Sequence, residues 1–111
     1  MIKYSNLKDI FTPLNIRVEE FSIKNQDEEI EPYFLVYVKT GDLPIFADGK
    51  NYYMLANCKA YLEVDNQNDE VVAKLENIFI ENGIGFEKSI EYIPDDRVFE
   101  LLYEFTVLDG W

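Results

Sequence analysis

A group of acidic residues between two predicted elements is the first candidate for chemistry. Asp65, Asp69 and Glu76 occupy the first, fifth and twelfth positions of an EF-hand calcium loop. Gln67 stands at the third position, however, and Glu70 replaces the glycine that permits the sharp turn of such a loop. A strand end followed by a helix cap explains these acids better. We therefore expect no metal site and no bound cofactor.

Adjacent acid pairs offer a second possible chemistry, because two carboxylates can act as a general acid and a general base. Glu28-Glu29 and Asp95-Asp96 are such pairs. Neighbouring acids in polar segments usually only increase solvation. The acid-rich residues 26–31 are interpreted in the same way, as a solvated loop or, alternatively, as a docking site for a basic partner.

The chain has no histidine and only one cysteine. Without histidine, serine and cysteine triads and histidine-ligated zinc sites are excluded. One cysteine cannot form a thiolate zinc cluster, and neither GxGxxG nor a phosphate-loop motif is present. Cys58 lies in an alternating run, which favours a buried small apolar residue, and a lone cysteine fits a reducing cytoplasm. We expect that the protein is not an enzyme.

Length and charge restrict the class of protein further. The 111 residues are the length of one domain, residues 1–111, and the hydrophobic content of 48% is sufficient for a core. The net charge is −12, so the average surface would repel nucleic acid and anionic membranes. No signal peptide and no apolar run long enough to span a membrane occurs, which predicts a soluble protein made in the cytoplasm.

Hydrophobic spacing predicts two helices and several strands. A short helix over residues 5–12 begins at Ser5 and is closed by Pro13, and a longer helix over residues 68–82 begins at Asn68. Strands are expected over residues 16–23, 33–40, 58–65, 84–93 and 97–108. The fold class is therefore α+β, a single domain with a mostly antiparallel sheet of about four to six strands, two helices and a protruding hairpin.

The hairpin is predicted in the stretch "FADGKNYYML", residues 46–55, whose Asp-Gly pair suits a tight turn. Tyrosine and tryptophan are common at interfaces because each is large and apolar with one polar group. The alternative is that the aromatic residues in and around the hairpin pack against the sheet of their own chain. The predicted interface residues are Phe46, Asp48, Tyr52, Tyr53 and Trp111.

Several strings, taken in their joint order, resemble a family of small proteins from the tail-assembly genes of long-tailed phages and prophages of Gram-positive bacteria. The proteins of this family are tail-terminator or head–tail joining proteins. None of the strings is a catalytic signature, and together they cover most of the chain from residue 32 onward. The strings are "PYFLVYV" (32–38), "FADGKNYYML" (46–55), "YLEVDNQND" (61–69), "LENIFIENGIGFEKSIEYI" (75–93) and "VFELLYEF" (98–105).

The resemblance implies a small α/β fold that assembles into a ring, commonly a hexamer. The ring would cap the finished tail tube, so the expected partners are further copies of the chain, the tail tube protein and the head connector protein. The location implied is the virion, after assembly in the host cytoplasm. Packaged DNA would pass through the ring without being bound specifically, and an acidic lumen would keep it from adhering.

Two other functions stay open at the level of sequence. A small acidic inhibitor that mimics DNA would explain the charge, but it needs acids spaced like phosphates on one face, whereas acids here alternate with apolar residues. The third alternative is an enzyme or ligand-binding domain in which the aromatic residues line a pocket.

Overall fold

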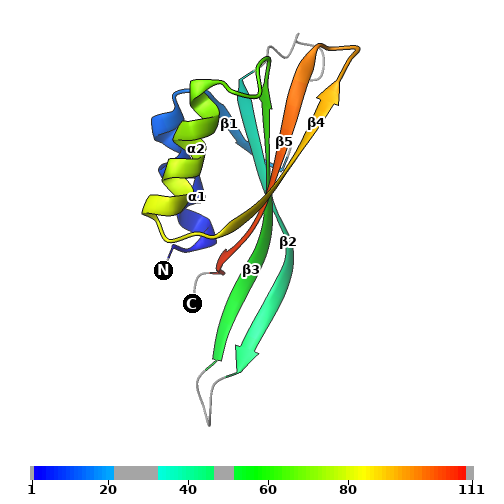
Figure 1. Ribbon diagram of the computed structural model, residues 1–111. Coiled ribbons are helices and arrows are strands. Elements are labelled where there is room, and N and C mark those ends of the chain that lie inside the picture. Colours follow the sequence, from blue (N-terminus) through cyan, green and yellow to red (C-terminus); the bar gives the residue numbers. More distant parts are fainter. Residues whose placement is uncertain (1, 22–32, 47–51, 110–111) are drawn as a thin grey trace.

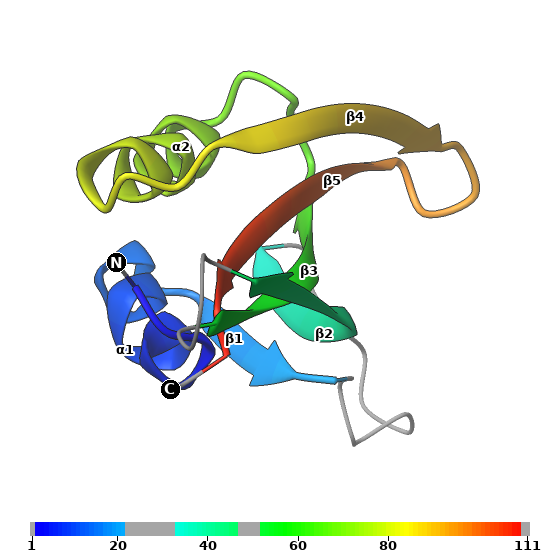
Figure 2. The ribbon, with the colours of Figure 1, turned by 90° about the horizontal axis from the view of Figure 1, so that it is seen from below.

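A twisted sheet with helices on one of its faces makes up the fold (Figures 1 and 2). The structure is a computed structural model that describes residues 2–21, 33–46 and 52–109. In these residues it has five strands and two α-helices, which confirms the predicted α+β domain. The elements are the 3-10 turn Tyr4–Asn6, α1 (Leu7–Phe11), the 3-10 turn Thr12–Leu14, β1 (Arg17–Glu20), β2 (Phe34–Phe46), β3 (Tyr52–Val64), α2 (Glu70–Glu81), β4 (Phe86–Ile93) and β5 (Val98–Leu108).

The strand order is β1-β2-β3-β5-β4, so β3 is the central strand. The β2–β3, β3–β5 and β4–β5 pairs are antiparallel, as predicted for most of the sheet, and β1 pairs with β2 in parallel. One irregularity, between Lys39 and Gly41, interrupts the β2–β3 register. Near the chain ends, Lys3 forms an isolated bridge with Leu108, which ties the N-terminal segment to the sheet.

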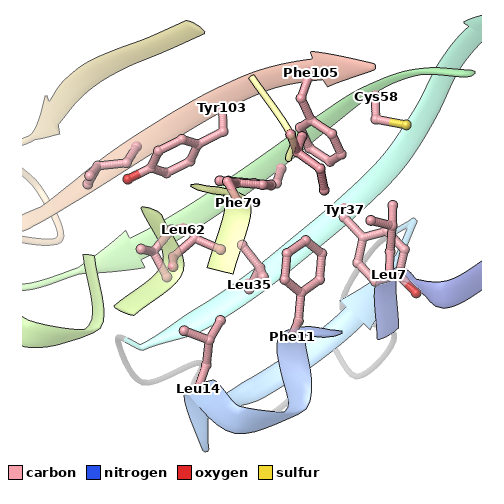
Figure 3. Close-up of a cluster of buried hydrophobic side chains, with 14 of the residues drawn as sticks. Leu7, Phe11, Leu14, Leu35, Tyr37, Cys58, Leu62, Phe79, Tyr103 and Phe105 are labelled. Carbon is pink, nitrogen blue, oxygen red and sulfur yellow. The ribbon is translucent and has the colours of Figure 1, made fainter. Parts of the chain in front are cut away.

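The core lies between the sheet and the helices (Figure 3). Every second residue of β3 from Ala56 to Val64 is buried, as the alternation predicted, and so is every second residue of β5 from Leu101 to Val107. The apolar stripe of α2 covers these strands, and all of its residues are buried except Ile78, which is half-buried. The stripe consists of Val71, Val72, Leu75, Ile78 and Phe79. The largest fully buried side chains are Tyr103, Phe11, Phe79, Leu7, Leu35, Leu62, Leu75, Leu101, Val64 and Val107.

The helix α2 starts one residue later than predicted, because Asp69 rather than Asn68 is its N-cap. The Asp69 carboxylate accepts a hydrogen bond from the Val71 amide at 3.0 Å, which satisfies one of the free donors of the first turn. The predicted stop is confirmed, since Gly83 adopts a left-handed φ of 71°. No helix in the described parts of the chain is long and apolar enough to cross a bilayer.

The N-terminal helix is shorter and less regular than predicted. One α-helical turn lies between two 3-10 turns, and the predicted cap Ser5 lies inside the first of them. The α-helix ends at Phe11, before Pro13, although the helical segment continues past this residue as a 3-10 turn. Pro13 lies near the start of that turn, where its missing N–H leaves no backbone partner unpaired. The helical segment ends at Asn15, whose φ is 57°.

The hairpin of β2 and β3 extends beyond the rest of the sheet (Figure 1). We call residues 43–46 of β2 and 52–54 of β3 the arm. β1 accompanies β2 only as far as Tyr37, and the β5 pairing of β3 begins at Leu55, the partner of Leu43, so the arm beyond Leu43 has only two strands. The prediction that β2 ends at residue 40 is wrong. The predicted Asp48-Gly49 turn lies outside the described residues.

The buried Phe79 gives the first test of this core. Its ring packs against four other aromatic rings and is fully buried, so Phe79→Ala should lower the free energy of unfolding by about 3–5 kcal/mol. The exposed Lys74 of the same helix is the control, and Lys74→Ala should change the free energy of unfolding by no more than about 0.5 kcal/mol. Urea denaturation measures both. A loss below about 1 kcal/mol for Phe79→Ala would contradict this packing.

Candidate functional site

The face of the sheet that carries no helix is the largest candidate site, and we call it the open face (Figure 2). Successive side chains of a strand point to opposite faces, so residues that alternate with the buried ones lie here. Several of these residues are apolar and half-buried, and others are charged. Residues of the open face include Val36, Val38, Lys59, Tyr61, Glu63, Glu100, Leu102, Glu104 and Thr106.

The arm end of the open face is apolar. Leu43 pairs with Leu55, which in turn pairs with Leu108, so the three leucines form one row across β2, β3 and β5. Leu43 and Ile45 are each 42% exposed, which is high for such large apolar side chains. Leu43 lies in the last three-stranded row and Ile45 lies where only β2 and β3 pair, so no second layer covers either side chain. This row is the strongest sign of a contact surface on the open face.

The middle of the open face is a polar groove of about 690 Å³. Asn57 of β3 links the neighbouring strands in this groove. The Asn57 side-chain oxygen accepts a hydrogen bond from Thr106 Oγ1 of β5 at 3.1 Å, and the Asn57 backbone carbonyl accepts one from Thr40 Oγ1 of β2 at 3.1 Å. Lys59, Glu104 and Glu87 follow in the next row. The groove offers hydroxyl, amide and charged groups for binding.

Cys58 also borders this groove, but its side chain belongs to the core set of β3 and is buried, as the sequence predicted. Burial, with the negative charge of Asp109 as a smaller cause, raises the pKa of the Cys58 thiol to about 12. The thiol is therefore protonated at neutral pH, and the thiolate is the form that acts as a nucleophile. Cys58 is a core residue and not a reactive one.

At the far end of the open face, three glutamates lie side by side across the sheet. Glu63 of β3 pairs with Glu100 of β5, and Glu100 pairs with Glu91 of β4. We call these residues the acidic row. Burial raises the pKa of the Glu63 carboxyl, and the negative charges of Glu100 and Asp96 raise it further. Like charges opposite one another destabilise a sheet, so the acidic row costs folding stability.

The acids that matched part of a calcium loop have structural partners. The Tyr33 hydroxyl lies within hydrogen-bonding distance of the Asp65 and Asp69 carboxylates, and these acidic neighbours raise the pKa of that hydroxyl. Glu76 accepts a hydrogen bond from the Lys88 ammonium at 2.9 Å. In the part of the chain that the structure describes, no group of three or more metal-ligating side chains forms a site.

The predicted interface residues fall mainly at the tip of the arm. Phe46 pairs with Tyr52 and Tyr53 pairs with Ile45, so three of the five come together in the backbone; the structure does not describe their side chains. The other two, Asp48 and Trp111, lie outside the described residues. The interface role of all five stays a prediction. Leu43 and Ile45 were not predicted as contact residues, although they occupy alternate positions in "DLPIF".

No protein-family model matches the chain, and no curated protein matches it.

The acidic row predicts a pH-dependent effect at Glu63. Its folded-state pKa is raised, so ionisation disfavours the folded state, and this cost develops as the pH rises above the unfolded-state value of about 4.3. Glu63→Gln should therefore raise the melting temperature at pH 7. The gain should disappear at a pH below the unfolded-state pKa, where wild-type Glu63 is neutral too.

Melting curves from pH 3 to pH 8 measure this gain. Glu81→Gln at the exposed end of α2 is the control, because it changes the net charge equally without touching the acidic row. If both substitutions have the same effect at pH 7, the local repulsion at Glu63 is refuted.

Proposed function

We propose that this chain is a tail-terminator or head–tail joining protein of a phage or prophage of Gram-positive bacteria. In this role several copies form a ring that caps the tail tube and docks to the head connector. The observation that carries the proposal is the arm, which projects from the sheet and bears the exposed Leu43 and Ile45 (Figure 1). Exposed apolar side chains on a projecting ribbon favour contact with another protein.

The arm suits a ring because its counterpart must be a different surface. In a head-to-tail contact, one subunit presents the arm and its neighbour presents another patch, and the ring closes when the rotation between copies divides a full turn. The open face of the neighbour offers suitable apolar side chains in Val36, Tyr61 and Leu102, which form one row. The hexamer that the resemblance implies is the expected copy number.

The chemistry of the described groups also supports binding rather than catalysis. The Cys58 thiol is protonated at neutral pH. The three acids that match part of a calcium loop, Asp65, Asp69 and Glu76, serve as a helix cap or as partners of tyrosine and lysine. The polar groove is lined by Asn57, Thr106 and neighbouring charged groups, which can position a partner. We therefore propose a structural protein of the virion, assembled in the host cytoplasm.

The negative charge of the chain, and the acidic row in particular, also fits this proposal. With a net charge of −12 and three glutamates in one row of the open face, the protein would repel DNA that passes through a ring. The same row is the one feature that favours the second candidate, an acidic inhibitor that mimics DNA. Adjacent strands are about 4.8 Å apart, so the row forms a compact line of negative charge.

The arm is tested by replacing its two exposed apolar residues together. Leu43→Ser/Ile45→Ser should leave the melting temperature of the monomer nearly unchanged, because both side chains are already exposed. It should abolish rings, seen by native mass spectrometry, and completed tails, seen by electron microscopy of tails assembled with the protein.

The control is Ile90→Lys, at an exposed apolar residue of β4 away from the arm, which should keep rings and tails. Rings that persist in the arm double variant would exclude the arm as the ring contact. A wild-type protein that forms no ring with tail components and instead blocks a DNA-binding enzyme, with loss of inhibition in Glu63→Gln/Glu91→Gln/Glu100→Gln, would favour the DNA mimic.

A further inference from the structure

The outer edge of β4 carries backbone groups that no described strand pairs with. In the sheet order β4 is terminal, and its eight residues pair with β5 without a bulge. The Met54 carbonyl accepts from the Asp109 amide, so even-numbered β3 residues direct their backbone groups towards β5. Even-numbered β3 residues pair with odd-numbered β5 residues, so the backbone groups of even-numbered β5 residues face β4. Leu102 of β5 pairs with Ser89, so the backbone groups of odd-numbered β4 residues face β5. The residues that face outward from β4 are therefore Phe86, Lys88, Ile90 and Tyr92.

The free edge of the arm is different, because it contains a proline. Pro44 pairs with Met54, whose backbone groups face β5, so the backbone of Pro44 faces away from β3. The missing N–H of proline then falls on the free edge, where it hinders another strand from pairing. β4 has no proline and no bulge, and the Lys88 side chain that could guard it is bound to Glu76 of α2.

Exposed apolar side chains lie along the same edge. Ile90 is 46% exposed and Tyr92 is 50% exposed, although both lie on the helix side of the sheet. Beside them, a groove of about 440 Å³ runs between α2 and β4, and its lining includes Lys88 and Ile80, which is 67% exposed. Unpaired backbone groups next to exposed apolar side chains are typical of an edge that receives another strand.

We propose that β4 pairs antiparallel with β4 of a second copy, about a two-fold axis that passes Ile90. The strand's own charges select this register. An axis at Lys88 or at Glu91 places that residue opposite itself, and an axis at Ser89 places Glu87 opposite Glu91, so each of these opposes like charges.

With the axis at Ile90 the pairing has no such conflict. Lys88 lies opposite the aromatic Tyr92, Ser89 lies opposite Glu91 and can donate a hydrogen bond to it, and Glu87 lies opposite Ile93. A hydroxyl beside a carboxylate is a favourable neighbour, and Lys88, whose ammonium stays bound to Glu76, meets no second cation. The charge pattern of β4 thus fits a second copy of the same strand.

The dimer would continue the sheet through both copies and keep the helices of both on the same face. The two α2 helices, each with its exposed Ile80, then flank the seam. Such an isologous contact closes at two copies and leaves no β4 edge free. It uses no residue of the arm, so it goes beyond the ring proposed above and can be tested separately.

Cysteine cross-linking tests the register. In the proposed pairing the two Ile90 residues form a hydrogen-bonded pair with Cα atoms about 5.5 Å apart, within the range of a disulfide. Ile90→Cys should therefore give a covalent dimer under mild oxidation. Ser89→Cys and Glu91→Cys should not, because the like residues are then diagonal neighbours at about 7–8 Å. Wild type, whose only cysteine is the buried Cys58, is the background.

A covalent dimer from Ser89→Cys or Glu91→Cys in place of Ile90→Cys would overturn the register, and the absence of any covalent dimer would overturn the pairing.

Sedimentation velocity tests the non-covalent dimer. Ile90→Lys puts two like charges at the axis and should weaken dimerisation at least about tenfold. The same substitution on the arm, Ile45→Lys, is the matched control and should leave the dimer unchanged. An unchanged melting temperature at low protein concentration shows that Ile90→Lys folds. A monomeric wild type, or equal dimerisation in the wild type and Ile90→Lys, would refute the proposal.

Discussion

The packing of one side chain, Phe79, holds the two layers of the protein together. From α2 its ring lies 5.9 Å from that of Phe11 of α1 and 4.9 Å from that of Phe105 of β5, between ring centroids (Figure 3). It also lies 5.2 Å from the ring of Phe86 of β4. Aromatic pairs at such distances stabilise a core beyond the area that they bury. Because this cluster draws both helices to one face, the other face of the sheet has no helix over its half-buried apolar residues.

The same cluster explains why the edge of β4 is poorly guarded. Tyr103 lies in the cluster with its hydroxyl directed to Glu76, to which it donates a hydrogen bond at 3.0 Å. Burial raises the pKa of the Tyr103 hydroxyl, so it remains a donor. Glu76 also binds the Lys88 ammonium, which draws the one cationic side chain of β4 towards α2. An interaction that stabilises the core thus takes a charge away from the edge.

The sequence was sufficient for the elements whose pattern is regular. The alternation around Ala60 and Leu62 predicted the strand β3 correctly, and the apolar stripe predicted the helix α2 correctly. Both patterns are regular because one face of each element is buried. The continuation of β2 was missed because Gly41 and Pro44 normally interrupt strands. Here a shift of the β2–β3 register between Lys39 and Gly41 allows the strand to continue. Pro44 faces the free edge of the arm, where no strand needs the N–H that proline lacks. The register shift and the orientation of Pro44 both depend on how β2 pairs with β3, and the residues around Gly41 and Pro44 alone do not specify that pairing.

The candidate surfaces were harder to predict than the core for a related reason. An exposed Leu43 or Ile90 has the same sequence signature as a buried one, because alternation indicates a face of a strand and not whether another layer covers it. Coverage depends on where the helices lie and on which strands end early. Once these are known, the two proposed contacts differ in symmetry: the proposed ring joins the arm to a dissimilar surface, whereas the proposed dimer joins β4 to itself. A chain with both could use β4 pairing to protect its unguarded edge while the arm stays available for a different contact.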